Sequence, residues 1–361
     1  MTEFEKWDNE FRNQNLYAFN GNFYGLLWLK VRAIRRSKLL RQFIKENKID
    51  LRATKVSEQN IELYDILEKR SDSMHILDTF LRCLNHEWYA EMGVDIEQLK
   101  EDLYRIQYYA WGGDQNNSLD KYFISRYVKV LSNYNELQNK QAEIGANAWD
   151  YVQNSWYNNW TSFVIESLFK RNQRVIPAVG EIKSVDFFIE DYPIDLKVTF
   201  FPSQFMEQKL KKIFGKSSIS WLKGKCKDVG ISCDNNSAVT QQFYTLSEKI
   251  KEANKLDILN ELDNARQQVI KDAQHNPVEL MQWLYENQGE MRFGAENRIY
   301  LILADTTDLY QSWKMKRAFP IIEPKVNQYL AEFTSSSLKT IKFEYKKKKY
   351  SALSDILFIV K

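Results

Sequence analysis

The stretch VDFFIEDYPIDLKVTF, residues 185 to 200, decides the fold of the second half of this chain of 361 residues. Short β-like runs, VDFFI and IDLKVTF, lie on the two sides of Glu190 and Asp191, and Pro193 follows this acidic pair, which predicts two short strands joined by a turn. Because successive side chains on a strand point to opposite faces, the apolar residues of both strands should form one buried face. These residues are Val185, Phe187, Ile189, Ile194, Leu196 and Val198.

The position of the turn determines which charged residues meet on the other face. A loop centred on Asp191 and Tyr192 places residue 186 opposite residue 197, and residue 188 opposite residue 195. This register predicts that Asp186, Asp195 and Lys197 lie together.

Outward from the hairpin, the spacing of apolar residues changes from that of strands to that of helices. Residues 1 to 148 show helical spacing almost throughout, so we expect an N-terminal helical domain there. Residues 149 to 361 form the second expected domain, which has a mixed α/β pattern. It comprises a helix near 153–171, β-like runs at 174–179, 183–190 and 194–201, helical segments within 239–287, and later strands at 298–305, 341–346 and 355–361.

Composition excludes several classes of protein. With 44% hydrophobic and 27% charged residues, the chain has the balance of an ordinary soluble globular protein. A formal net charge of +3 excludes a uniformly basic coat for nucleic acid, although local basic grooves remain compatible with it. No run approaches the roughly twenty apolar residues that cross a bilayer. We therefore expect no membrane association, and a cytoplasmic location, because no secretion signal is apparent.

Cofactor motifs of two common kinds are missing from the sequence. Its cysteines, Cys83, Cys226 and Cys233, do not combine with the scattered histidines at the spacing of a zinc site. No glycine-rich phosphate loop follows a predicted strand, which argues against an ATPase.

The charged face of the hairpin has the composition of a site for a divalent metal ion. Two carboxylates and an amine on a strand pair backed by apolar residues are costly to bury unless they are paired or bind a metal. Mg²⁺ typically takes one or two carboxylates, several waters and phosphate oxygens of the substrate. Such an ion polarises a phosphate and lowers the pKa of a bound water, and Lys197 would orient that water or offset charge in the transition state. This pattern predicts hydrolysis of a phosphodiester bond.

Asp186, followed after a short hairpin by Asp195-Leu196-Lys197, resembles the PD-(D/E)xK motif of the restriction-endonuclease-like nucleases. The resemblance covers about residues 155 to 305 and implies an αβββαβ core with a mixed sheet, as in type II restriction endonucleases. It implies Asp186, Asp195 and Leu196 as metal-binding positions and Lys197 as the catalytic lysine. Glu166, on the preceding helix, is implied as a further catalytic residue and metal ligand. Val185 stands where the motif has proline.

A structural interpretation of the same residues competes with the catalytic one. Asp186 and Lys197 would then form a cross-strand ion pair on a solvated face, and Asp195 would be merely exposed. Glu166 would belong to the wet face of an amphipathic helix.

The sequence therefore predicts a Mg²⁺-dependent endonuclease, with Mn²⁺ as a substitute ion, that acts on double-stranded DNA as a homodimer with one site in each subunit. Restriction or another anti-phage defence is the expected setting, by resemblance alone. Two alternatives stay open: a defence effector nuclease whose helical domain senses a trigger, and a nucleic-acid-binding protein that kept the fold without activity. The choice between RNA and DNA is also open.

A cluster of lysines follows the hairpin. Near a nuclease site such a cluster is suited to contact phosphates, or it is a solvated surface. The cluster consists of Lys209, Lys211, Lys212, Lys216, Lys223, Lys225 and Lys227.

Overall fold

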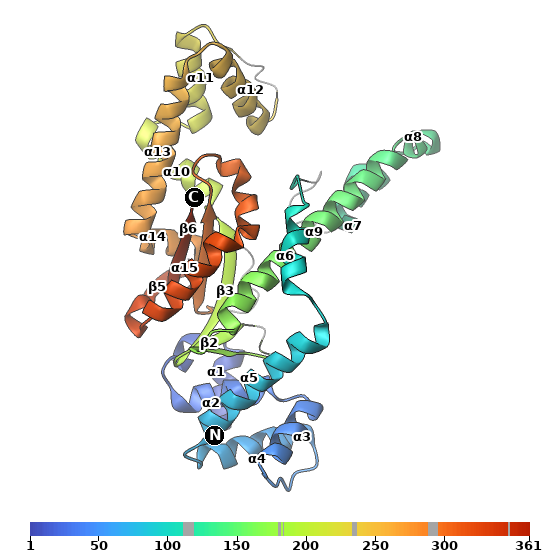
Figure 1. Cartoon of the computed structure of the whole chain (residues 1–361), viewed down its shortest axis with the longest axis vertical. Coiled ribbons are helices and arrows are strands. Elements are labelled where there is room, and N and C mark those ends of the chain that lie inside the picture. Colours follow the sequence, from blue (N-terminus) through green and yellow to red (C-terminus); the bar gives the residue numbers. More distant parts are fainter. Residues whose placement is uncertain (111–118, 180–181, 183, 233–236, 288–294, 346) are drawn as a thin grey trace.

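A six-stranded mixed sheet lies at the centre of the protein in its computed structural model, which describes residues 1–110, 119–179, 182, 184–232, 237–287, 295–345 and 347–361 (Figure 1). The strand order is β1-β2-β3-β4-β6-β5. The first three strands pair antiparallel, β3, β4 and β6 run parallel, and β5 pairs antiparallel with β6. Their bounds are β1 Val175–Pro177, β2 Phe187–Ile189, β3 Tyr192–Phe200, β4 Arg298–Ala304, β5 Lys339–Tyr345 and β6 Lys348–Val360.

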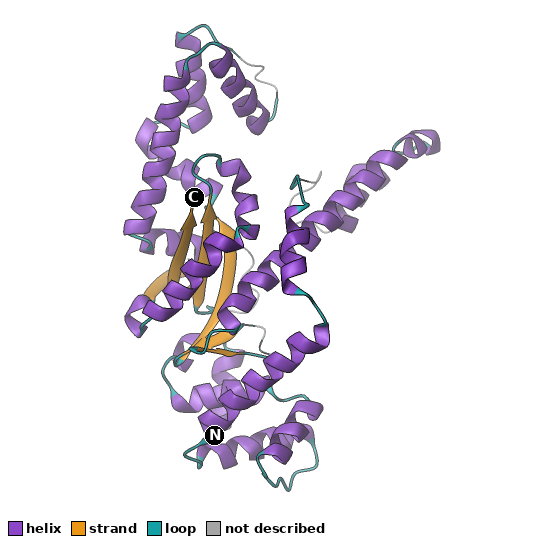
Figure 2. Cartoon of the chain, in the orientation of Figure 1, coloured by secondary structure: helices purple, strands orange, loops and turns teal. Residues whose placement is uncertain are grey.

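Helices cover both faces of this sheet, which makes the architecture mixed α/β as predicted (Figure 2). One face packs against α6 (Ile96–Tyr104), α9 (Gln141–Lys170) and α15 (Phe319–Glu332). The opposite face packs against α10 (Ser203–Phe214), α13 (Leu256–His275) and α14 (Val278–Asn287). The short helices η3 (Leu309–Arg317) and η4 (Ser335–Ser337) complete this half of the chain.

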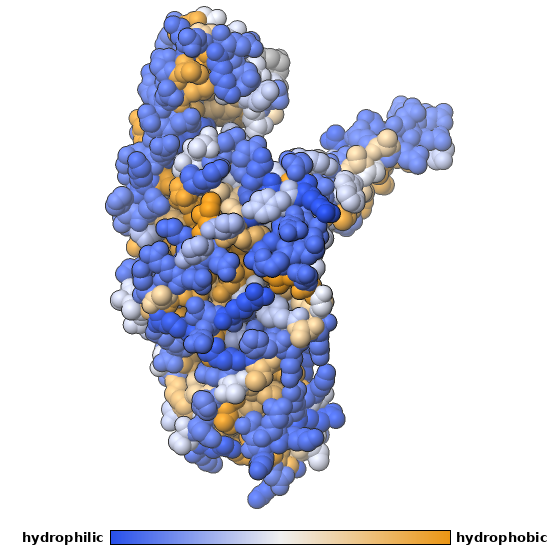
Figure 3. All heavy atoms as spheres, viewed as in Figure 1, coloured by the Kyte–Doolittle hydropathy of each residue, from blue (hydrophilic) through white to orange (hydrophobic). Residues whose placement is uncertain are grey.

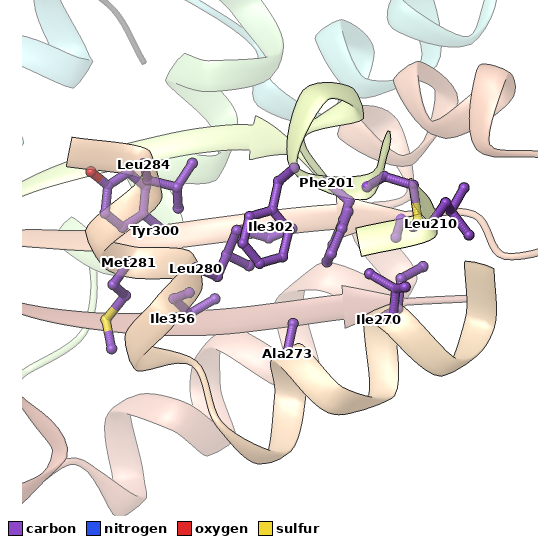
Figure 4. Packing of buried hydrophobic residues seen from close by; sticks show 14 of the residues in the cluster. Phe201, Leu210, Ile270, Ala273, Leu280, Met281, Leu284, Tyr300, Ile302 and Ile356 are labelled. Carbon is purple, nitrogen blue, oxygen red and sulfur yellow. The ribbon is translucent and has the colours of Figure 1, made fainter. Parts of the chain in front are cut away.

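The burial of strand β4 on both faces explains why its apolar residues follow one another without polar residues between them. All seven of its residues are buried, because both of its faces lie under helices. Ile299, Leu301 and Leu303 join the core beneath α9 and α15. Tyr300 and Ile302 join the opposite core, where they meet side chains of α10, α13 and α14 (Figure 4).

Two helices form a lobe beyond the carboxyl ends of β3, β4 and β6 (Figure 1). They are α11 (Ser218–Asp228) and α12 (Val239–Glu252), and both pack against α13. The face of this lobe shown in Figure 3 is largely hydrophilic.

The N-terminal helices build a third core that includes part of the hairpin. Ile176, Ile182, Val185 and Phe188 lie in this core, so β2 is buried on both faces. Val185 was predicted to share a face with Phe187, and this prediction is wrong, because the third core draws Val185 to the side of Phe188. The helices are α1 Glu3–Arg12, η1 Leu16–Phe19, α2 Phe23–Ala33, α3 Ser37–Glu46, α4 Val56–Glu68 and α5 Ser73–Met92.

Polar contacts fasten the N-terminal helices to the sheet. The amide nitrogen of Gly21 donates to the carbonyl oxygen of Asp191 at 3.0 Å. The side-chain amides of Asn20 and Asn297 bond to each other, and Asn297 also donates to the carbonyl oxygen of Pro193 at 3.0 Å. The start of β4 and the hairpin turn are therefore held by the same loop of the N-terminal helices.

Helix α9 extends from the sheet into an arm that projects from the body (Figure 1). It runs without interruption through residue 148, the predicted end of the first domain. Three short helices lie along or at the tip of the arm, namely α7 (Leu119–Phe123), η2 (Ile124–Val128) and α8 (Tyr134–Asn139).

None of the helices in the described ranges is both long enough and apolar enough to span a bilayer.

Replacement of Phe188 by alanine tests whether the hairpin depends on the N-terminal core. The ring is fully buried, and Lys30 Nζ lies 5.4 Å from its centroid. We expect Phe188→Ala to lower the free energy of unfolding by about 3–5 kcal/mol, measured by urea denaturation. The exposed Tyr310, changed to alanine, is the control and should shift it by no more than about 0.5 kcal/mol. Equal effects of the two changes would contradict the packing described here.

Candidate active site

The hairpin turn differs from the predicted one and changes the register of the two strands. Ile189 pairs with Tyr192 and Phe187 with Ile194, so the turn residues are Glu190 and Asp191 rather than Asp191 and Tyr192. Glu190 takes a positive φ of 51°, as tight hairpin turns require, and Arg174 donates to its carboxylate at 2.7 Å. The predicted register, which placed residue 186 opposite residue 197 and residue 188 opposite residue 195, is wrong, because Phe188 pairs with Pro193.

Asp186 directly precedes β2 and lies beside the β3 backbone. Its amide nitrogen donates to the carbonyl oxygen of Ile194 at 2.8 Å, and its carboxylate accepts a bond from the amide of Leu196, also at 2.8 Å. Burial, followed by the neighbouring charges of Asp195 and Glu166, raises the pKa of the Asp186 carboxyl to about 6. Three carboxylates therefore act on one another electrostatically at this end of the sheet.

Asp195 is buried on β3 and is held by two cations. Lys197 Nζ lies 2.9 Å from its Oδ1, and Arg298 Nε lies 3.2 Å from its Oδ2. The parallel register of β3 and β4 pairs Asp195 with Arg298, and Arg298 also bonds to Glu296 at 2.6 Å. A carboxylate in the interior is tolerated when it is paired in this way.

The remaining predicted residues surround this pair of aspartates. Glu166 lies on α9 and forms an ion pair with Lys170 at 2.5 Å, one helical turn away. The Lys197 side chain is 48% exposed, so it lies at the boundary between the buried Asp195 and solvent. Leu196 buries its side chain in the core beneath α9, which leaves its main-chain oxygen as the ligand that it is able to supply.

The ion pair of Lys197 differs from the one that the structural interpretation of the sequence predicted. This lysine pairs with Asp195 of its own strand, whereas the alternative interpretation had paired it with Asp186 across the hairpin. Asp195 is buried, so it is not merely an exposed charge.

The net charge of this cluster is compatible with a bound divalent cation, whereas the arrangement of its side chains is not that of a metal site. Four carboxylates, of Asp186, Asp195, Glu166 and Glu296, stand against three cations, Lys170, Lys197 and Arg298, which leaves one negative charge if all are ionised. Burial is the main cause of the raised pKa of Asp186, and the neighbouring negative charges of Asp195 and Glu166 raise it further. Within the described ranges, however, no three side chains of His, Cys, Asp or Glu are arranged to hold a metal ion.

Arg298, Glu296 and Lys170 belong to the cluster but were missed in the sequence. Arg298 opens the apolar run of β4, and its role depends on the parallel pairing with β3, which no local pattern reveals. Lys170 was detectable, because it lies four residues after Glu166 in a helix.

Comparison of the chain with models of known families, with curated proteins and with solved structures gave no match.

The buried charge of Asp186 predicts a stability effect that depends on pH. Its folded pKa of about 6 exceeds the ordinary value of 3.8, so the folded state disfavours the ionised form at neutral pH. The folded protein thus loses stability as pH rises through this interval. We expect Asp186→Asn, measured in EDTA, to raise the free energy of unfolding by about 2 kcal/mol at pH 7.5. The gain should shrink as pH falls to 4.5. The exposed Asp191→Asn variant is the control, and a gain for Asp186→Asn that does not change with pH would exclude this explanation.

Proposed function

We propose that the protein is a Mg²⁺-dependent endodeoxyribonuclease of the restriction-endonuclease-like kind, and that Mn²⁺ can replace the ion. One observation carries the proposal. Asp186 and Asp195 lie close enough for the charge of Asp195 to raise the pKa of Asp186, and Lys197 Nζ lies 2.9 Å from Asp195. Two carboxylates and one lysine amine are the groups that phosphodiester hydrolysis requires in such a site.

The order of elements supports the same proposal. Helix α9 precedes β1, β2 and β3, and helices then lead to β4, which pairs parallel with β3. This sequence of elements agrees with the αβββαβ order that the resemblance implies. The proposal assigns this fold family from topology and motif together, and fold alone does not establish an activity.

Each residue of the cluster has a role in the proposed reaction. Asp186 and Asp195 would hold the metal ion, together with the main-chain oxygen of Leu196, and Glu166 would contact it directly or through water. The bound ion would supply Lewis acidity and a water of lowered pKa. Lys197, which is half exposed, would orient the attacking water or offset charge on the phosphate. Arg298 would fix the carboxylate of Asp195 through the bond at 3.2 Å.

Cleavage of plasmid and phage DNA in Mg²⁺, Mn²⁺ or EDTA tests the proposal. We expect metal-dependent cleavage by the wild type, and a loss of at least about a hundredfold in Asp195→Ala and Lys197→Ala, since each removes a group that acts in the transition state. Asp191→Ala is the matched control, because this carboxylate lies in the hairpin turn near the cluster and should leave cleavage unchanged. Discrete fragments would favour restriction. Absence of cleavage, or equal cleavage by all variants, would refute the catalytic assignment.

A defence effector nuclease controlled through its N-terminal helices is the second candidate. It is favoured by the shared core, because Phe188 and Val185 of the hairpin pack among residues of α2 and α5. Any trigger that shifts these helices would displace the chain segment that carries Asp186. A nucleic-acid-binding protein without activity remains the outcome if the wild type binds DNA and no metal supports cleavage.

A homodimer formed through the arm is part of the proposal. Gly145, Trp149, Val152 and Trp156 follow one another at helical spacing on α9, and Trp149 is 61% exposed. At the tip, Tyr134 is 74% exposed. Residues 119–152 contain four basic and four acidic residues, so the arm has no net charge that would select nucleic acid.

The area of this apolar stripe is appropriate for a second copy of the arm. An aromatic side chain buries about 150–250 Å² when it is fully covered. The exposed side chains of Tyr134, Trp149 and Val152 would therefore supply part of the roughly 800 Å² that each partner contributes to a stable interface. Two arms related by a twofold axis would bring two nuclease sites to one duplex.

Light scattering at several concentrations tests the dimer. We expect the wild type to have twice the mass of the chain, and Trp149→Asp to be monomeric or at least tenfold weaker in dimerisation, because a carboxylate would be placed in the apolar interface. Ser155→Asp, which lies on the same helix and is exposed, is the control. A monomeric wild type would exclude the arm as a dimer contact.

A further inference from the structure

The helices α10 and α11 form a closely joined pair whose charge differs from that of the rest of the chain. Residues 203–228 contain seven lysines and two acidic residues, a net charge of +5, whereas the whole chain has +3. The remainder of the chain therefore has a net charge of −2. Positive charge is concentrated in this one pair of helices.

The turn between the two helices is short and well defined. Gly215 ends α10 with a φ of +70°, a conformation that glycine adopts without strain. Ser217 begins α11 and accepts a bond from the amide of Ser220 at 3.3 Å. Glu207 of α10 accepts from the amide of Ser218 at 2.9 Å. The two helices are thus fixed to each other, and Glu207 is occupied inside the pair instead of neutralising a lysine.

Packing determines which side of α11 remains outside. Trp221, Leu222 and Cys226 are buried in the core, and Trp221 stacks on Phe214 with centroids 4.4 Å apart. The opposite side of α11 carries Ser220, Lys223 and Lys227, at intervals of three and four residues, and Lys216 lies in the turn two residues before the helix. Lys223 and Lys227 are therefore one turn apart on the same side of α11.

The lysines are close together although like charges repel. Lys216 Nζ lies over α11 beside Gly224, a residue between Lys223 and Lys227. A Cβ atom added to Gly224 would be 3.3 Å from this amine. Lys209 and Lys225 pair with Glu279 and Glu261 at the sides of the pair. The ion pairs identified in the described ranges include no carboxylate bound to Lys216 or Lys227, both of which are exposed.

We propose that the lysine row of α10 and α11, namely Lys216, Lys223 and Lys227, binds the phosphate backbone of duplex DNA. The occupant follows from charge, because a strand of duplex DNA carries one phosphate per 3.4 Å of helix axis, and a compact group of amines is suited to neutralise neighbouring phosphates. Lys223 and Lys227 lie about 6 Å apart along the axis of α11, and Lys216 Nζ reaches the same part of the helix beside Gly224. The inference rests on the proposed function for its choice of DNA, and it assigns that enzyme a substrate contact separate from the nuclease site.

Anisotropy of a fluorescent 24-base-pair duplex, measured in EDTA between 50 and 300 mM salt, tests this contact apart from cleavage. We expect Lys216→Gln/Lys223→Gln/Lys227→Gln to bind at least tenfold more weakly than the wild type at the lowest salt, and to reduce the salt slope by about 2 to 3, since each phosphate contact contributes about 0.9. The same three lysines changed to arginine should retain both affinity and slope.

The matched control removes three positive charges elsewhere. Lys45, Lys69 and Lys325 are exposed on other helices, and their triple change to glutamine should alter affinity less than twofold. Equal weakening by the two glutamine triples, or none by the first, would overturn the proposal. If the first glutamine triple loses DNA binding while the wild type cleaves nothing, the lysine row is upheld and the nuclease is rejected. If the wild type cleaves DNA while the first glutamine triple keeps the wild-type salt slope, the nuclease is upheld and the lysine row is rejected.

Discussion

The structure depends on the buried contact between Asp195 of β3 and Arg298 of β4. These residues face each other where two parallel strands begin, and both have less than a tenth of their surface exposed. A charge between strands that are covered by helices is poorly solvated, so each of the two residues is stabilised by its ion pairs, Asp195 with Arg298 and Lys197, and Arg298 with Asp195 and Glu296. The contact joins the starts of the two central strands, which pair in register from Asp195 and Arg298 onward, and Arg298 also holds Glu296. Removal of either partner would leave the other with a single ion pair, to Lys197 for Asp195 and to Glu296 for Arg298.

The sequence revealed much of the fold because apolar periodicity follows burial. The strands of the hairpin, β4 and the N-terminal helices were all predicted, and the mixed α/β class was confirmed. The prediction was wrong where tertiary contacts outweigh local pattern. Val185 left the face of Phe187 because a third core lies on the other side of β2, a partner that strand alternation does not include. The last strand begins at Lys348, although its polar first half suggested a start near residue 355, because pairing with β5 supplies its hydrogen bonds.

The candidate site was predicted in part for a related reason. Residue types and strand context were sufficient to select Asp186, Asp195 and Lys197, and Asp195 and Lys197 do meet. Arg298 comes from a strand more than a hundred residues away, and only the parallel pairing places it in the cluster. The pKa of Asp186 in that cluster is raised, because burial and two neighbouring carboxylates disfavour its charge. A perturbed pKa of this kind is typical of catalytic groups, although structural ion-pair networks also produce such shifts.

Helix α9 connects the tip of the arm with the candidate site at the sheet (Figure 1). Its 30 residues extend about 45 Å, from the tip of the arm to Glu166 and Lys170 beside Asp186. A straight helix of this length does not absorb a sideways displacement locally, so it acts as a lever whose short end carries Glu166. A small rotation about the sheet would change the distance of Glu166 from Asp186 while it swings the tip through many times that distance. A contact that holds the tip of the arm in place would therefore also limit the movement of Glu166 relative to Asp186.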